Sequence, residues 1–419
     1  MKQILAILII STIAVSGCII RPVAPAKPST PPSGTTPPTV QQKPEAQVVI
    51  SARASKIAQL IGDVDRERQQ PTLNLTWTHY KLAGTDLGVP FRHKDKTYLL
   101  FGDTVGLRGG DAIAYTTDTT PDDGIELTFI HDNLAYKPVK IPGISQGAFE
   151  VPMEGVSIGG RMYIYHTTDS IGVSEMFSEG AEPKMGRSIV AVSDDDGQTF
   201  SYLYDFSSKH FINVSIVEVD KADLSAVFAA GAGKALVIFG SGPYRRSDVR
   251  LAVQPSDQIG SHSSIRYFAG LDSSGRPTLS SNEDDAQALF NQPVVGELSV
   301  SYNRFINKWI MLYNSFMPTS RGINMRTADK LWGPWSEPQI IFHPWNDNGY
   351  CHFMHAGFPH EQCDEVSDPN RDKEYGGEYG PYQFEDLAVG SDTSTTIYFT
   401  MSTWNPYTVE LMKATLQSK

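Results

Sequence analysis

The 419-residue sequence is short of cysteine and of basic charge. It has three cysteines, and its 35 Lys and Arg residues are outnumbered by 47 Asp and Glu residues, which gives a formal net charge of −12. Binding to nucleic acid or to an anionic membrane surface requires clustered basic charge, so this balance argues against both. The sequence also lacks a dinucleotide-binding loop, a P-loop and a nucleophile elbow, and we expect no cofactor.

The first eighteen residues, MKQILAILIISTIAVSGC, predict export. Lys2 precedes an apolar run from Ile4 to Val15, which is too short for an ordinary spanning helix and is typical of a signal peptide. The four residues that end in Cys18 resemble the bacterial lipobox, in which the peptide is cut before a cysteine that is lipidated. We predict a signal peptide over residues 1–17, lipidation of Cys18 and an exported lipoprotein of the cell envelope. The alternative is a chance cysteine after a plain signal.

Residues 18–47 are rich in Pro, Thr, Ser and Ala, with eight prolines between Pro22 and Pro44. Such a composition cannot bury a core and favours extended polyproline geometry, at about 3.1 Å per residue. We predict a stalk that holds a folded domain away from the membrane. Residues 48–72 have the apolar spacing of a short helical lead-in, and we place the folded domain at residues 73–419.

The stretch from Asp86 to Thr104, DLGVPFRHKDKTYLLFGDT, has the pattern of a β-hairpin. Two apolar strands flank a charged turn at Lys94 and Asp95. Antiparallel pairing around that turn predicts that Asp86 lies opposite Asp103. Directly opposed residues have Cβ atoms about 4.5–5.5 Å apart, and like charges at that distance destabilise a sheet. We infer that a role other than stability explains the pair.

The same hairpin pattern recurs after Glu154, Leu224, Glu297 and Tyr382. With starts near residues 86, 154, 224, 297 and 380, the spacings are 68, 70, 73 and 83 residues. Repeats of this size that contain only strands predict propeller blades, each of about four strands around a central axis. We therefore predict an all-β fold, a five-bladed β-propeller that follows the lipoprotein signal and the Pro-rich linker.

Residues 193–200, SDDDGQTF, match the Asp-box pattern, a hairpin turn that satisfies its own hydrogen bonds and is common on propeller blades. The motif supports the architecture and says almost nothing about catalysis. It raises the hypothesis of a sialidase, but a single box without a clear arginine triad argues against that activity.

The longest irregular segment runs from His343 to Gly380 and contains Cys351 and Cys363. Histidines lie between or beside the two cysteines, so one interpretation is a zinc site. In an exported protein, two cysteines twelve residues apart more simply form a disulfide that restricts the loop. We predict the disulfide and no metal, and free thiols are the third alternative.

Four carboxylates are candidates for catalysis, namely Asp86, Asp103, Glu154 and Glu297. Glycoside hydrolysis uses one carboxylic acid to protonate the leaving oxygen and a second carboxylate as base or nucleophile. The two Asp residues meet that requirement, since close carboxyl groups have pKa values that move apart. Each Glu begins the equivalent strand of its own repeat and could reach the same central funnel. For each of the four, the alternative role is to accept backbone N–H bonds from a neighbouring blade.

Four further residues are candidates for substrate binding, namely His166, Arg245, Tyr382 and Trp404. His166 and Tyr382 stand at matching strand ends, whereas Arg245 belongs to an arginine cluster that follows a Gly-rich turn. Guanidinium groups can hydrogen-bond sugar hydroxyls, which suits a polysaccharide partner. A structural role is the alternative for each residue.

The segments DLGVP and FGDT, with the terminal MSTWNPYTVELMK, resemble the family catalogued as domain of unknown function 4185, over residues from about 75 to 415. Members of that family include the endo-D-arabinofuranases of glycoside hydrolase family 183, which cleave the D-arabinan of mycobacterial cell walls with a five-bladed propeller. The resemblance implies that Asp86 and Asp103 lie in an active centre. The sequence departs from the family pattern at residues 152–155 and in the cysteine-containing loop.

Two hypotheses of different classes follow. The first is an exported, lipid-anchored and monomeric glycoside hydrolase, an endo-acting D-arabinofuranase, that cleaves a furanoside-containing polysaccharide. The second is a non-catalytic carbohydrate- or protein-binding propeller displayed on a lipoprotein stalk. The formation of product from a glycan distinguishes the two.

Overall fold

The computed structural model describes residues 47–170, 186–225, 232–243, 245–293, 295–315 and 322–419. The predicted signal peptide, Cys18 and all but the last residue of the predicted linker lie outside these ranges. Within them the chain is built of strands, with one short α-helix, α1 (Thr76–Tyr80). No helix in this part of the chain has the length and apolarity needed to cross a membrane.

Five antiparallel sheets form the blades of the propeller, and each has one innermost strand. Blade 1 consists of β4 (Leu82–His93), β5 (Lys96–Gly106), β6 (Ala112–Thr116) and β7 (Thr128–Phe129). Blade 2 consists of β8 (Pro152–Ile158), β9 (Arg161–Thr168), β10 (Arg187–Ser193) and β11 (Ser201–Ser207). Blade 3 consists of β12 (Asn213–Asp220), β13 (Lys234–Ser241), β14 (Arg250–Pro255), β15 (Arg266–Leu271) and β16 (Pro277–Ser280).

Blades 4 and 5 complete the set. Blade 4 consists of β17 (Val295–Asn303), β18 (Lys308–Ser315), β19 (Ile323–Ala328) and β20 (Gln339–Phe342). Blade 5 consists of β21 (Glu378–Ser391), β22 (Ser394–Thr403), β23 (Thr408–Ser418) and β1 (Val48–Gln59). The smaller elements are β2 (Val64–Asp65), β3 (Gln70–Pro71) and the 3₁₀ turns η1 (Ser256–Gln258), η2 (His262–Ser264), η3 (Glu283–Asp285) and η4 (Glu361–Cys363).

The innermost strands close into a ring. Strand β4 contacts β8, β8 contacts β12, β12 contacts β17, β17 contacts β21, and β21 returns to β4. Outside this ring each sheet extends strand by strand away from the axis. The prediction of a five-bladed β-propeller is therefore confirmed.

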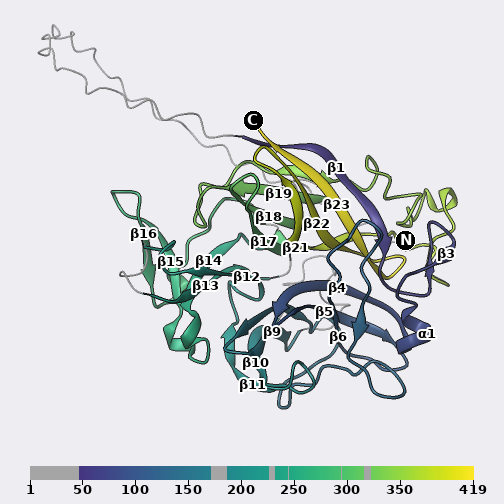
Figure 1. The fold of residues 1–419 in the computed structure, drawn as a ribbon, viewed down its shortest axis with the longest axis horizontal. Coiled ribbons are helices and arrows are strands. Elements are labelled where there is room, and N and C mark those ends of the chain that lie inside the picture. The colour runs from purple at the N-terminus through teal and green to yellow at the C-terminus, as the bar shows by residue number, and fades with distance from the viewer. Residues whose placement is uncertain (1–46, 171–185, 226–231, 244, 294, 316–321) are drawn as a thin grey trace, which may run out of the picture. The chain divides into compact units, whose positions relative to one another are not determined.

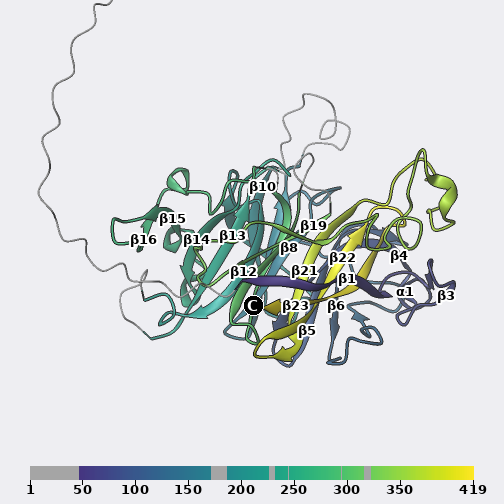
Figure 2. The ribbon, with the colours of Figure 1, turned by 90° about the horizontal axis from the view of Figure 1, so that it is seen from above.

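The strand β1 is the outermost strand of blade 5, where it pairs antiparallel with β23. The purple β1 lies along the yellow β23 in both views (Figure 1, Figure 2). The prediction of a helical lead-in over residues 48–72 is therefore wrong. Irregularities of register between Ile50 and Ala52, between Ala52 and Ser55 and again before Ala58 break the period of two, so the apolar spacing imitates a helix.

The first hairpin has the predicted turn but not the predicted register. His93 pairs with Lys96 across the turn, as expected. Towards the open end, however, Asp86 pairs with Gly102 and not with Asp103. The register shifts between Gly84 and Asp86 and again beyond Leu87, and such irregularities place an extra residue on one strand. The predicted direct pairing of the two Asp residues is therefore wrong, although their carboxyl groups still interact, as described below.

The third predicted repeat is also displaced. Its hairpin consists of β12 and β13, so the innermost strand lies before Leu224 and not after it. The Asp box forms the expected turn between β10 and β11. The hydroxyl of Thr199 donates a hydrogen bond of 2.6 Å to Asp195, and the carboxylate of Asp195 also accepts the hydroxyl of Ser193 at 2.8 Å.

Apolar side chains fill the space between neighbouring blades. Between blades 3 and 4, for example, Val217 and Phe239 are buried in one cluster with Leu298 and Met311. Full burial of such a side chain contributes roughly 1.5–3 kcal/mol. Because this packing holds the innermost strands in place, it also fixes the polar residues at their ends.

Candidate active site

Asp86 in β4 and Asp103 in β5 come together at the open end of the first hairpin. The two carboxyl groups interact, because the charge of Asp103 raises the pKa of Asp86. Two like charges in a partly dry site favour a state in which one group is protonated and the other ionised.

Asp86 is deeply placed, with only 7% of its surface exposed. Its Oδ2 accepts a hydrogen bond of 3.0 Å from the hydroxyl of Tyr379, whereas Oδ1 has no partner of good geometry among the described residues. Burial and then the charge of Asp103 raise its pKa well above the ordinary value, and the hydroxyls of Tyr379 and Tyr407 oppose the shift. Both of the larger contributions therefore favour the protonated form of Asp86.

Asp103 is more accessible and lines a cavity of about 480 Å³. The N–H of Phe149 donates to both of its carboxylate oxygens, at 3.0 and 2.9 Å. Burial raises the pKa of Asp103 to about 7, the N–H of Phe149 opposes this, and the charges of Asp111 and Glu150 add to it. Because Asp103 is the less buried of the pair and accepts an N–H bond on each oxygen, it is the carboxyl group that ionises first.

A buried chain of hydrogen bonds supports Asp103 from behind. Its N–H donates to Oδ1 of Asp111 at 3.2 Å, and Oδ2 of Asp111 lies 2.9 Å from Nε2 of His166. The other ring nitrogen of His166 lies 2.6 Å from the carbonyl oxygen of Thr167. His166 was predicted to bind substrate, but its exposed fraction is 0% and both nitrogens are engaged. This placement favours a positioning role, exerted through Asp111.

The lack of a side chain at Gly102 leaves space for the carboxyl group of Asp86. A Cβ atom at this position would lie 2.9 Å from Oδ1 of Asp86 and 2.6 Å from Cγ1 of Val151. A side chain here would collide with the carboxyl group on one side and with blade 2 on the other. In the Gly-Asp dipeptide of the FGDT segment, Gly102 therefore leaves space for the carboxyl group of Asp86, and Asp103 supplies the second carboxyl group.

Glu297, the third residue of β17, belongs to the same centre. Its Oε2 accepts a hydrogen bond of 2.7 Å from Nδ2 of Asn314 and lies 4.0 Å from Nε of Arg245. Its charge adds to the shift that raises the pKa of Asp86. The structure thus groups Glu297 and Arg245 with the Asp pair.

Glu154 lines a different space, a cavity of about 340 Å³ among the innermost strands that shares no lining residue with the cavity at Asp103. Its carboxyl group accepts the N–H groups of Gly155 and Ile216, at 2.9 and 3.0 Å. Burial raises the pKa of Glu154 to about 8, although both N–H groups oppose the shift. Ile216 belongs to the adjacent blade, so Glu154 has the alternative, structural role of accepting a backbone N–H bond from a neighbouring blade. Tyr382 is buried and lines the same cavity.

Trp404 lies where a substrate-binding residue is needed, because it lines the cavity that contains Asp103. Its indole N–H donates to Glu374 at 2.8 Å, and the guanidinium of Arg371 lies 4.5 Å from the ring centre. The ring also meets Tyr407 edge-on, with 5.7 Å between centres. These contacts hold an indole that is 40% exposed at the side of the cavity.

Four residues of the site were not predicted, namely Asp111, Phe149, Tyr379 and Tyr407. The two tyrosines are distant from Asp86 in sequence and reach it only because blade 5 closes against blade 1. The backbone conformation, rather than a sequence motif, marks this part of the site. Leu87, Asp103 and Phe149 have positive φ angles of 67°, 43° and 65°. Residues in this region are uncommon and tend to gather at functional sites.

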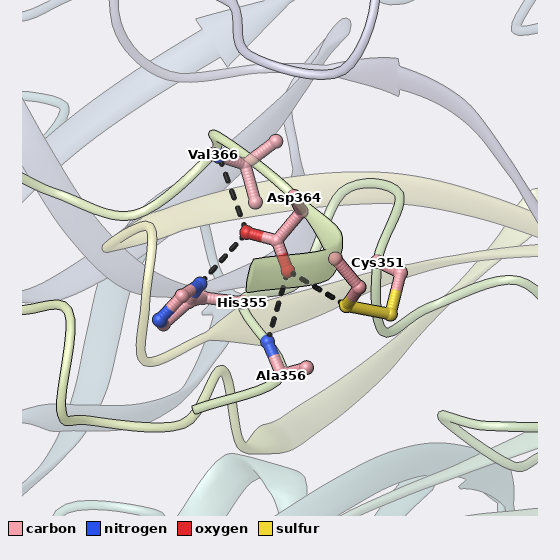
Figure 3. Close-up of a disulfide and its surroundings, with 6 residues drawn as sticks. Cys351, His355, Ala356, Asp364 and Val366 are labelled. Atoms are coloured by element: carbon pink, nitrogen blue, oxygen red, sulfur yellow. Dashed lines mark hydrogen bonds and ion pairs between the residues drawn. A yellow bond between two sulfur atoms is a disulfide. The ribbon is translucent and has the colours of Figure 1, made fainter. Parts of the chain in front are cut away.

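The predicted disulfide forms between Cys351 and Cys363, with 5.1 Å between Cα atoms (Figure 3). Beside it, Asp364 accepts the N–H of Ala356 at 3.1 Å and lies 2.7 Å from Nδ1 of His355. The two sulfur atoms are joined to one another, so they are not thiolate ligands for zinc in this structure.

The fold and site define a five-bladed propeller with paired carboxyl groups at one end of its first hairpin. The family model described as Domain of unknown function (DUF4185) matches residues 72–413, and the chain belongs to this family. A comparison with curated proteins found no match.

Several solved structures are similar to this chain at low sequence identity and with TM-scores below 0.5. An exo-β-1,3-galactanase from Phanerochaete chrysosporium in complex with galactose has a TM-score of 0.42 and 9% identity, over 86% of this chain and 64% of that one. This chain thus spans less than two thirds of the galactanase. The catalytic domain of the GH62 α-L-arabinofuranosidase of Coprinopsis cinerea has a TM-score of 0.43 and 9% identity, over 88% and 98%. The native arabinanase of Bacillus subtilis has a TM-score of 0.40 and 11% identity, over 80% and 96%.

Proposed function

We propose that this protein is an exported glycoside hydrolase that cleaves a furanoside-containing polysaccharide, as an endo-acting D-arabinofuranase. The observation that carries the proposal is the carboxyl pair, in which Asp86 is buried, with its pKa raised by burial and by the charge of Asp103, while Asp103 lines a cavity of about 480 Å³. Glycoside hydrolysis requires this division of roles. The choice of sugar is supported by the resemblance of the DLGVP and FGDT segments to family 183 enzymes.

In the proposed reaction, Asp86 is the general acid. It donates its proton to the glycosidic oxygen as the bond from that oxygen to the anomeric carbon breaks. Asp103 either removes a proton from an attacking water, which inverts the anomeric centre, or attacks the carbon itself, which retains it. The charge of Glu297 helps to keep the proton on Asp86 before reaction.

The proposal is tested by incubating the soluble domain with D-arabinan, L-arabinan and a panel of bacterial glycans, followed by chromatography of the products. We expect oligosaccharides from D-arabinan and none after either Asp86→Asn or Asp103→Asn. Thermal unfolding of both variants establishes that the loss is chemical. Full turnover by both variants would contradict the assignment.

The same experiment separates the second hypothesis, a non-catalytic binding propeller on a stalk. That hypothesis expects calorimetric binding of a glycan or protein without any product. If the wild-type domain binds D-arabinan and never releases a fragment, the binding function replaces the enzymatic one.

We further propose that the chain is a monomer held at the cell envelope through lipid on Cys18. The support for the lipid anchor is the sequence of residues 1–18 and the Pro-rich segment that follows. Labelling of growing cells with a fatty-acid probe should mark the wild-type protein and leave Cys18→Ala unmarked. Equal labelling of the two would contradict lipidation at this residue.

A further inference from the structure

Exposed aromatic side chains gather around a second cavity, of about 520 Å³. Phe358, Tyr375 and Trp345 line it, with exposed fractions of 80%, 53% and 45%. All three belong to the irregular segment 343–377 between β20 and β21, which we call the aromatic segment. Exposed aromatic groups around a hollow are typical of a binding surface.

The aromatic segment is braced so that its rings keep their positions. The ring of Trp345 packs against Tyr350, with 4.8 Å between centres, and edge-on against His360, at 5.2 Å. Tyr350 directly precedes Cys351, and His360 lies three residues before Cys363. The disulfide, drawn in Figure 3, therefore ties together the two stretches that contact the tryptophan. A cross-link of this kind limits the conformations open to a loop that lacks regular structure.

Internal hydrogen bonds anchor the aromatic segment to the propeller. His355 bonds Asp364 at 2.7 Å, and both side chains are buried. The N–H of His355 also donates to the carbonyl oxygen of Asn405 at 2.9 Å, and the N–H of Gly376 donates to the carbonyl oxygen of His355 at 2.6 Å. The segment is therefore fastened to the β22–β23 turn that carries Trp404.

A backbone hydrogen bond joins the wall of the aromatic cavity to the wall of the cavity at Asp103. Gly377 lines the aromatic cavity and Trp404 lines the cavity at Asp103. The backbone N–H of Trp404 donates to the carbonyl oxygen of Gly377 at 3.0 Å. The same segment contributes Arg371 to the wall beside Asp103. The aromatic cavity adjoins blade 4 through Asn314, whereas the cavity at Asp103 adjoins blades 1 and 2.

Residues of the Asp pair and their partners are connected to the walls of both cavities. Asp103 itself lines the cavity near blades 1 and 2. Asn314 lines the aromatic cavity and bonds Glu297, whose charge reaches Asp86.

We propose that the aromatic cavity is a carbohydrate subsite, in which the segment 343–377 holds sugar residues of the polysaccharide on one side of the bond to be cleaved. This inference rests on the proposed function and extends it, because it assigns the substrate as several consecutive sugars. The C–H faces of furanose rings pack on Phe358, Tyr375 and Trp345, and their hydroxyls reach polar groups on the wall such as Arg245.

The test measures binding of a hexasaccharide and a disaccharide of D-arabinofuranose by calorimetry, in an Asp103→Asn background that prevents turnover. Combining Trp345→Ala with Phe358→Ala should weaken hexasaccharide binding by about tenfold, since two aromatic contacts are removed. Disaccharide binding should change by less than about twofold, because so short a ligand does not need the second cavity. The matched control is Trp77→Ala, which removes an indole that is also 45% exposed and lies on α1, outside both cavities.

A second variant tests the bracing. Replacing both Cys351 and Cys363 by Ser should weaken hexasaccharide binding at least threefold and leave disaccharide binding unchanged, because the aromatic wall loses its cross-link. Unchanged hexasaccharide binding in the Trp345 and Phe358 double variant would overturn the inference. Binding that depends on these rings, in a wild-type protein that releases no product, would support the subsite and remove the proposed hydrolase function.

Discussion

The hydroxyl of Tyr379, in β21 of the last blade, donates a hydrogen bond of 3.0 Å to Oδ2 of Asp86, in β4 of the first blade. This bond crosses the junction at which the ring of blades closes. The protonation of Asp86 therefore depends on closure of the propeller, and a residue 293 positions away helps to set it.

Tyr379→Phe tests this relationship. The hydroxyl lowers the pKa of Asp86, so its loss should raise that pKa further. A hydrogen bond to a charged group is worth roughly 1.5–3 kcal/mol, which corresponds to a shift of about one pH unit or more. If Asp86 is the general acid, the alkaline limb of the pH profile of kcat/KM should move to higher pH. A limb that stays in place would show that the bond does not control the acid.

Asp103→Asn should move the pKa of Asp86 in the opposite direction. The amide removes the negative charge that raises this pKa, while burial continues to raise it. We expect a lower value that still lies above the ordinary range of an aspartic acid. Carbon-13 NMR titration of the Asp86 carboxyl group in wild type and variant measures the difference. Identical titration curves would mean that the two groups are not coupled.

Gly102→Ala should lower both activity and stability, because a Cβ atom here would lie 2.6 Å from Cγ1 of Val151 as well as close to Asp86. The new methyl group would lie 2.9 Å from Oδ1 of Asp86, so the acid must turn away from its working position. A misplacement of about 1 Å can cost about 10²-fold in rate. Gly109→Ala is the matched control, because a Cβ atom there meets nothing within 4 Å. Wild-type kcat in Gly102→Ala would show that the position of Asp86 is not critical.

Glu154→Gln separates a structural carboxyl group from a catalytic one. Burial raises the pKa of Glu154 to about 8, so the folded state binds a proton that the unfolded state releases near pH 4.5. Its contribution to stability is fully present below pH 4.5 and is lost as the pH rises through about 8.

The neutral amide does not titrate, so the stability of Glu154→Gln relative to wild type should improve by on the order of a few kcal/mol between pH 5 and 8. Urea unfolding at both pH values measures this change. The variant should keep wild-type kcat at pH 6, where the native group is protonated. A loss of 10³-fold or more would return Glu154 to the catalytic set.

The features that the sequence predicted are local. The turn at Lys94 and Asp95 and the Asp box depend on residues within a few positions of one another, and the repeated hairpins indicated the number of blades. The pairing of Cys351 with Cys363 also spans a single loop.

The features that the sequence did not predict depend on bulges and on contacts between distant segments. A bulge moved Asp86 opposite Gly102, and another between Pro152 and Glu154 interrupts the regular alternation, so the strand-start argument could not fix the direction of Glu154. Tyr379 meets Asp86 only because the last blade closes against the first.

The division of labour between the two Asp residues can be measured most directly by comparing two substrates that differ in leaving group. A nitrophenyl furanoside leaves without protonation, whereas the sugar of D-arabinan needs an acid. We predict that Asp86→Asn loses at least about 10³-fold in kcat/KM on D-arabinan and much less on the nitrophenyl furanoside, while Asp103→Asn loses both activities. Hydrolysis of D-arabinan by Asp86→Asn at the wild-type rate, or equal losses on the two substrates, would contradict the assignment of Asp86 as the acid.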